Sequence, residues 1–266
     1  MLQLLRTPRW IGWLAFLTIY VVVCCALGVW QWDRREQAQT AISRLDANWS
    51  APATPLQEAL PDPAEFDQDQ QWQRVELEGR YLVDEALMIR GRMVAGQVGF
   101  QQLVPFLTDS GSVFYVDRGW VPVSAETNEV PAAYPEIPEG DVSVLVRLRE
   151  DEGELRDQDA PEGQVYSADL DRLSGQYDTT VYTGAYGLLE SEDGAVPTDI
   201  TVQERPLLDE GPHLSYALQW GVFALIGVGG FIYALRQESL NDSDEPRPNR
   251  KKRRDEEEED ALLDAG

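Results

Sequence analysis

The sequence predicts an α+β protein in which two transmembrane helices flank one extracytoplasmic domain with a mainly antiparallel β-sheet or barrel and a few short helices. Two apolar runs without a charged residue, at 10–29 and 214–235, predict the two spans. Alternating apolar and polar residues between the runs predict the strands. The segment 30–212 carries 13 Arg, no Lys and 36 acidic residues, a net charge of −23 that is typical of a soluble surface.

The run at 10–29 is long enough to cross a hydrocarbon core of about 30 Å as a helix. Backbone groups left unpaired in lipid cost several kcal/mol, so both runs are expected to be helical. A cleaved signal peptide is the alternative, because Arg6 and Arg9 precede the run. The run is longer than a signal peptide's apolar region and no small-x-small cleavage site follows it, so we expect a retained anchor.

Basic residues flank both spans on the side that should be cytoplasmic. Arg6 and Arg9 precede the first span, and Arg236 and the basic run at 250–254 follow the second. We therefore expect a multi-pass protein of the cell membrane with both termini inside, at 1–9 and 236–266, and a domain at 30–213 outside. The charged tail is predicted to be disordered. The acidic domain argues against nucleic acid as a partner.

The elements between the spans follow in order. Residues 30–48 are polar and lack Gly and Pro, which predicts that the first helix continues out of the membrane. Four prolines at 51–69 predict a linker with a short helical turn at 56–60. The alternation at 75–80 predicts the first strand. Further strands are expected at 86–90, 98–106, 113–120, 142–148 and 181–188, with a turn at 109–111 and a short helix at 169–176.

Several classes of site are disfavoured by composition. Both cysteines, Cys24 and Cys25, lie inside the first span, which excludes disulfides and thiolate metal sites from the domain. His213 is the only histidine, and no nucleophile elbow, phosphate loop or dinucleotide fingerprint accompanies it. A copper site is disfavoured because only Met88, Met93 and His213 offer suitable ligands outside. The protein is therefore not expected to be an enzyme.

The outer ends of the two spans gather the remaining candidates at one depth. The first span ends with Trp30, Arg34 and Arg35, and the second begins with His213, Tyr216 and Trp220. An aromatic belt, an interfacial histidine and contacts to lipid phosphate would explain these residues without a ligand. An anionic ligand held at the membrane surface is the alternative that the two arginines leave open.

Four sequence blocks resemble the surfeit locus protein 1 family. Residues 27–35, Leu-Gly-Val-Trp-Gln-Trp-Asp-Arg-Arg, resemble its opening motif Leu-Gly-x-Trp-Gln-x-x-Arg, and 73–81 resemble its Arg-x-Val-x-Val-x-Gly-aromatic strand. Gly99-Phe100 and Pro105-Phe106, followed by Val-Asp-Arg-Gly-Trp-Val-Pro at 116–122, resemble its Val-Asn-Arg-Gly-aromatic-Val-Pro block. Residues 213–220 resemble its His-Leu-x-Tyr-x-x-x-Trp motif. The composition of the domain further suggests a bacterial, actinobacterial member.

The resemblance implies an assembly factor for heme-copper cytochrome c oxidase that delivers heme a. Its implied partners are the catalytic subunit, heme a synthase and the lipid bilayer. The family's histidine corresponds to His213, which would ligate the heme iron as the metal ligand. A heme also needs an apolar wall and cations for its propionates. The expected cofactor-binding residues are His213, Trp220, Tyr216, Trp30 and Arg34, with Arg35 or Arg118 as further propionate partners.

A structural protein is the competing interpretation. Such a protein would stabilise the oxidase or a respiratory supercomplex through its helices and outer sheet, without binding a cofactor. Arg118 and Trp120 would then be packing residues.

Overall fold

A computed structural model describes residues 4–127, 129–155 and 160–244. The chain divides into two compact units, each considered by itself below. The first is helical and comprises the chain up to Ala38 and from Glu210 onward. The second comprises Gln39–Asp209 and contains the sheet.

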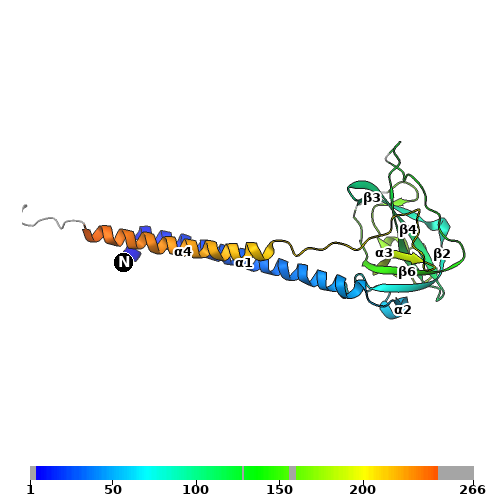
Figure 1. The fold of residues 1–266 in the computed structure, drawn as a ribbon, viewed down its shortest axis with the longest axis horizontal. Coiled ribbons are helices and arrows are strands. Elements are labelled where there is room, and N and C mark those ends of the chain that lie inside the picture. The colour runs from blue at the N-terminus through cyan, green and yellow to red at the C-terminus, as the bar shows by residue number, and fades with distance from the viewer. Residues whose placement is uncertain (1–3, 128, 156–159, 245–266) are drawn as a thin grey trace, which may run out of the picture. The chain divides into compact units, whose positions relative to one another are not determined.

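The helical unit contains two long helices, α1 (Pro8–Trp49) and α4 (His213–Asp244), after a short 3-10 helix, η1 (Leu4–Arg6). The last turns of α1 belong to the sheet unit. Both helices are long and apolar enough to cross a membrane, which confirms the two helices predicted from the apolar runs. They run side by side in Figure 1.

Aromatic residues hold the two helices together. The rings of Trp10 and Phe231 meet edge to face with centroids 5.4 Å apart. The Tyr20 hydroxyl donates a hydrogen bond to the Phe223 carbonyl oxygen at 3.2 Å. At Gly28, an added Cβ would lie 3.7 Å from the backbone of α4, so the helices approach closely there.

Both helices extend beyond the apolar runs. The continuation of α1 to Trp49 confirms the helical extension predicted for 30–48. The end of α4 at Asp244 differs from the expected disorder after 235, because 236–244 contain no Gly or Pro and an existing helix adds residues at little cost. Residues 245–266, which hold the rest of the predicted disordered tail, lie outside the described residues.

The second unit is a mainly antiparallel sheet of eight strands in the order β1-β2-β6-β8-β5-β4-β3-β7. Three pairings are parallel, β1–β2, β3–β7 and β5–β8. A further pairing of β2 with β4 closes β2, β6, β8, β5 and β4 into a ring. Of the two predicted alternatives, sheet or barrel, the structure has the barrel. The strands are β1 (Thr54–Pro55), β2 (Arg74–Tyr81), β3 (Leu87–Val94), β4 (Gln97–Thr108), β5 (Val113–Pro122), β6 (Asp141–Glu150), β7 (Gln164–Val165) and β8 (Ala185–Glu192).

Gly79 permits the closure of the ring. It lies in the half of β2 that pairs with β4, opposite Thr108. A Cβ at this position would lie 2.2 Å from the Leu107 carbonyl oxygen, and the residue has φ +149°. Only glycine lets the two backbones approach this closely.

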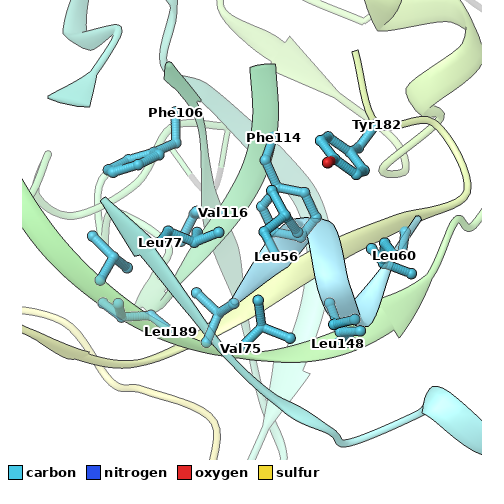
Figure 2. Close-up of a cluster of buried hydrophobic side chains, with 14 of the residues drawn as sticks. Leu56, Leu60, Val75, Leu77, Phe106, Phe114, Val116, Leu148, Tyr182 and Leu189 are labelled. Carbon is cyan, nitrogen blue, oxygen red and sulfur yellow. The ribbon is translucent and has the colours of Figure 1, made fainter. Parts of the chain in front are cut away.

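An apolar core fills part of the barrel interior. Figure 2 shows side chains from several strands converging on Leu56 and Leu60 of the segment that contains helix α2 (Leu56–Ala59). Tyr81 and Phe106 meet edge to face inside it, with centroids 5.1 Å apart. The alternating burial along β2 follows from the alternating sequence pattern, since successive side chains of a strand point to opposite faces.

The outer face of the sheet has its own core. Leu45 in the last turns of α1 and Leu170 of helix α3 (Leu170–Ser174) pack there against buried strand residues. The guanidinium of Arg147 lies 3.7 Å from the centroid of the Trp49 ring and donates to the Trp49 carbonyl oxygen at 2.8 Å. The end of α1 is thereby fixed to this unit by cation–π and hydrogen-bond contacts.

The local predictions were mostly accurate, with one misplaced strand start. The expected strand at 181–188 begins at Ala185, because the N–H groups of Thr183 and Gly184 donate to the Pro63 carbonyl oxygen instead of a strand. The two-residue strands β1 and β7 are too short to leave a periodic pattern. Two short 3-10 helices, η2 (Gln68–Gln70) and η3 (Val83–Glu85), were also not predicted.

Candidate functional site

His213 begins α4 and is held by a residue of α1. Its Nδ1 lies 2.8 Å from Oε1 of Gln31, and the imidazole is half-buried. An amide oxygen can only accept, so Nδ1 carries the proton in this bond and Nε2 keeps the lone pair. The bond therefore presents Nε2 as the ring nitrogen able to ligate a metal.

Gly211 leaves space next to that nitrogen. It has φ +67°, and an added Cβ would lie 3.3 Å from both Nε2 and Cδ2 of His213. Such a contact is tighter than an ordinary van der Waals contact. Glycine at this position therefore allows the positive φ of the turn before α4, and it leaves the Nε2 edge of the His213 ring free of a neighbouring side chain.

An apolar groove of about 390 Å³ lies between the helices, starting one residue after His213. Small residues form much of it, which opens space between the helix backbones. Its lining residues are Cys24, Cys25, Gly28, Val29 and Trp32 of α1 and Leu214, Ala217, Leu218, Trp220, Gly221 and Ala224 of α4. Both cysteines are reduced and lie in this wall, which agrees with their predicted role as small apolar residues.

Two arginines lie over two tryptophans near the same end of α1. The Arg34 guanidinium lies 5.9 Å from the Trp30 ring centroid, and that of Arg35 lies 5.8 Å from the Trp32 centroid. Arg34 also donates to Gln37 at 3.1 Å and is exposed. Both indoles are about half exposed, so each pair has an open face.

Arg35 has a second contact. Its Nε lies 3.4 Å from Oε2 of Glu210, and its side chain is 25% exposed. This ion pair joins α1 to the segment just before His213. Arg34 therefore presents the more accessible cation, and Arg35 the more restrained one.

The predicted residues are arranged as follows. Trp220 lines the groove. His213 is the first residue of α4 and directly precedes Leu214, the first groove residue on that helix. Tyr216 and Trp30 do not line the groove, and their side chains are 46% and 50% exposed. The same end of the helix pair thus carries an oriented imidazole, an apolar groove and two guanidinium groups.

Arg118 lies in the other unit, inside the barrel. Its Nε and Nη2 donate to the two Glu192 carboxylate oxygens at 2.7 and 3.0 Å, and its Nη1 donates to Gln102 at 2.7 Å. Tyr81 donates to the same carboxylate at 2.8 Å. The side chain is 1% exposed and its donors are held by Glu192 and Gln102, which favours the packing role of the competing interpretation over contact with a propionate.

The charges of this cluster are fixed by burial and pairing. Burial opposes the charged form of Arg118, but the hydrogen bonds and charge of Glu192 raise its pKa overall. Burial, followed by the charge of Glu192, raises the pKa of Tyr81 well above its usual value. The cluster is therefore a neutral phenol beside a buried ion pair at physiological pH.

Three residues of this end of the helix pair were not assigned a role from the sequence. Gln31 orients His213, Trp32 lines the groove and Gly211 leaves space at Nε2. Gln31 belongs to the block Leu-Gly-x-Trp-Gln at 27–31, which was the available signal. No local pattern marks the other two, because their roles depend on contacts made in space.

The sequence is similar to a known protein family and to several of its members. A family model described as the SURF1 family matches residues 18–225. Uncharacterized SURF1-like proteins of Mycobacterium bovis and Mycobacterium tuberculosis are each 30% identical over 258 residues, covering 94% of this chain and 93% of theirs. A SURF1-like protein of Monosiga brevicollis is 27% identical over 240 residues, covering 81% of this chain and 85% of its own.

Proposed function

This chain belongs to the SURF1 family, and we propose on that premise that it is an assembly factor of heme-copper cytochrome c oxidase. In this proposal it binds heme a at the outer surface of the cell membrane and transfers it to the catalytic subunit. Heme a synthase would supply the heme. The protein acts as a chaperone without catalytic turnover.

The bond between Gln31 and His213 beside an apolar groove is the observation that carries the proposal. Heme binding requires an imidazole, an apolar wall and cations for the propionates, and the donor set at this end of the helix pair fits these needs. Bound heme a supplies an iron whose absorption spectrum reports its axial ligands.

Each residue has a defined task in this proposal. Gln31 holds the His213 proton on Nδ1, so that Nε2 is available as the iron ligand. Trp220 and the small groove residues provide an apolar surface. Arg34 binds a propionate, with Arg35 as its neighbour. Tyr216 and Trp30, which are exposed, contact the outer part of the ligand.

The proposed topology follows from charge. Both termini lie in the cytoplasm, since basic residues flank the apolar runs on that side. Residues 30–213 then lie outside, and the barrel is the platform that meets the catalytic subunit. Delivery to a membrane-embedded subunit requires a donor site at membrane depth, which this topology supplies.

The test uses the full-length protein, purified in detergent from cells that make heme a. We expect co-purified heme a with a spectrum of imidazole ligation, and a loss of at least tenfold in heme per protein in His213→Ala. Gln219→Ala is a matched control, because this exposed residue lies on the same helix and does not line the groove. Unchanged heme content and spectrum in His213→Ala would refute the assignment of the ligand.

A deletion strain separates delivery from scaffolding. The oxidase purified from it should lack heme a in the catalytic subunit while retaining its subunits. An oxidase with full heme occupancy but reduced subunit stability would instead identify a structural protein.

A further inference from the structure

A cavity of about 710 Å³ lies in the sheet unit, and none of its lining residues belongs to the groove of the helix pair. It is bounded by the turn between β3 and β4, by β5, and by residues 201–207, which we call the strap. The strap is attached at Thr201, which exchanges backbone hydrogen bonds of 2.8 and 3.0 Å with Trp120 of β5. Gly119 makes this attachment possible, since an added Cβ would lie 2.5 Å from the Thr201 carbonyl oxygen.

Asp117 of β5 lines the cavity and is 2% exposed. Its Oδ1 accepts a hydrogen bond from the Gly119 N–H at 3.0 Å. Its Oδ2 is also buried but has no hydrogen-bond partner among the described residues. A buried acceptor without a partner is costly, and in native proteins such a group is explained by strain, by a functional role, or by a bound water or ion.

The charged groups packed around Asp117 do not neutralise it. Arg92 of β3 is ion-paired with Glu152, and Arg149 of β6 lies over the Trp72 ring at 4.9 Å. Burial raises the pKa of Asp117 to about 7, which Arg92 and the Gly119 N–H only partly oppose and Glu152 reinforces. Tyr186 of β8 faces the same group and is a neutral phenol, because burial raises its pKa.

The strap contributes no uncommitted cation either. It carries Glu204 and Arg205, and Arg205 forms an ion pair with Asp46. The cavity therefore offers a buried carboxyl and a second acidic side chain. Each described arginine beside it has an ion pair or an aromatic contact, although Nε of Arg92 has no hydrogen-bond partner among the described residues. An added positive charge would satisfy the unpartnered oxygen.

The rim of the cavity is apolar and exposed. Met93 on one side is 67% exposed and Leu207 of the strap is 99% exposed. The Trp120 indole also lines the cavity and is fixed by its bond from Nε1 to the Arg92 carbonyl oxygen at 3.1 Å. Tryptophan and arginine are enriched among the residues that contribute most to binding in protein–protein interfaces, and they often fill pockets at the interface centre.

We propose that this cavity is a docking site for a basic side chain, an arginine or a lysine, presented by a partner protein. Asp117 is the counter-charge, Trp120 is the surface on which the cation lies, and the rim contacts apolar residues next to it. The net charge of −23 on segment 30–212 would attract such a partner over long range. The proposal does not depend on heme binding.

The test measures binding of N-acetyl-arginine amide to the full-length protein in detergent, with N-acetyl-citrulline amide as the uncharged analogue. We expect the arginine compound to raise the unfolding temperature and the citrulline compound to leave it unchanged. Its affinity should be roughly tenfold higher at pH 8 than at pH 6, because the Asp117 carboxyl ionises between these values.

Variants locate the effect. Asp117→Asn should abolish binding, whereas Asp141→Asn, at an exposed acid that starts β6, should retain it. Leu207→Lys places a tethered cation at the rim and should weaken binding several-fold, and its exposure makes it compatible with folding even if Asp117→Asn is not. Equal binding of the two compounds, or full binding by Leu207→Lys and any folded Asp117→Asn, would overturn the proposal.

Discussion

Gln31 Oε1 and His213 Nδ1 lie 2.8 Å apart although the residues are 182 positions apart in the chain. One helix thus fixes the ring orientation and tautomer of a histidine on the other. A held imidazole with a free Nε2 is what the proposed heme ligation requires.

Replacing Gln31 tests this orientation. Gln31→Leu removes the acceptor while keeping the size of the side chain, so we expect roughly a 10- to 100-fold loss of heme affinity, as for other partners of metal-bound histidines. Heme titration of the purified protein followed by absorption gives the affinity. Gln31→Glu, which keeps an acceptor oxygen, should recover most of it. Equal affinity in the leucine variant would show that the bond has no part in ligand binding.

Breaking the ion pair inside the barrel should affect stability rather than heme. Arg118→Ala leaves the buried Glu192 carboxylate without its cation and should lower the free energy of unfolding by about 3–5 kcal/mol. Denaturant unfolding followed by circular dichroism measures the loss. Where the variant remains folded, its heme content per protein should match the wild type. A lower heme content in the folded variant would instead indicate that Arg118 binds a propionate.

Asp117 should make the stability of the barrel depend on pH. Its pKa of about 7 in the folded state exceeds the usual 3.8, so folding favours the protonated carboxyl. The contribution is fully present below about pH 4 and is lost as pH rises to about 7. Between pH 5 and pH 8 we expect a loss of roughly 2–3 kcal/mol that is absent in Asp117→Asn. Urea unfolding at both pH values, without any ligand, tests this.

Gly79 should be essential to the closed barrel. Gly79→Ala places a methyl group 2.2 Å from the Leu107 carbonyl oxygen, which forces β2 away from β4. We expect a loss of at least about 2 kcal/mol in stability, with increased amide exchange in the paired residues of these two strands. Gly140→Ala is a useful control, because it shares a positive φ but has open space at its Cβ. Similar losses in both variants would point to backbone strain alone.

The sequence predicted the parts of this molecule that depend on local patterns. Apolar runs were sufficient for the two long helices, and the alternation in β2 marked the strand and its buried face. The pairing of β2 with β4 could not be predicted from a local pattern, because it depends on how distant strands come together and on the close backbone approach at Gly79. The contact between Gln31 and His213 was equally hidden, since no periodicity joins two helices separated by a whole domain.

Arg118 shows how a motif can be found in the sequence while the contacts of its residues stay hidden. The residue lies where the pairing of β4 with β5 shifts between Gln102 and Leu103. Phe114 and Val116 belong to the core inside the barrel, so alternation along β5 places Arg118 on the same inner face. Its ion pair with Glu192 joins two strands that are far apart in the chain, and no local sequence pattern predicts such a contact.

The closure of the barrel limits how other proteins can recognise this domain. Each of the five strands in the ring has a paired neighbour on both sides, although β5 and β8 pair over only two residues. Most backbone donors and acceptors of the ring are therefore already used. The ring therefore offers a partner little free edge to which it could add a strand of its own. Recognition must therefore rely on side chains and on the segments outside the ring, and such contacts can be formed and released without disturbing the hydrogen bonds that hold the barrel together.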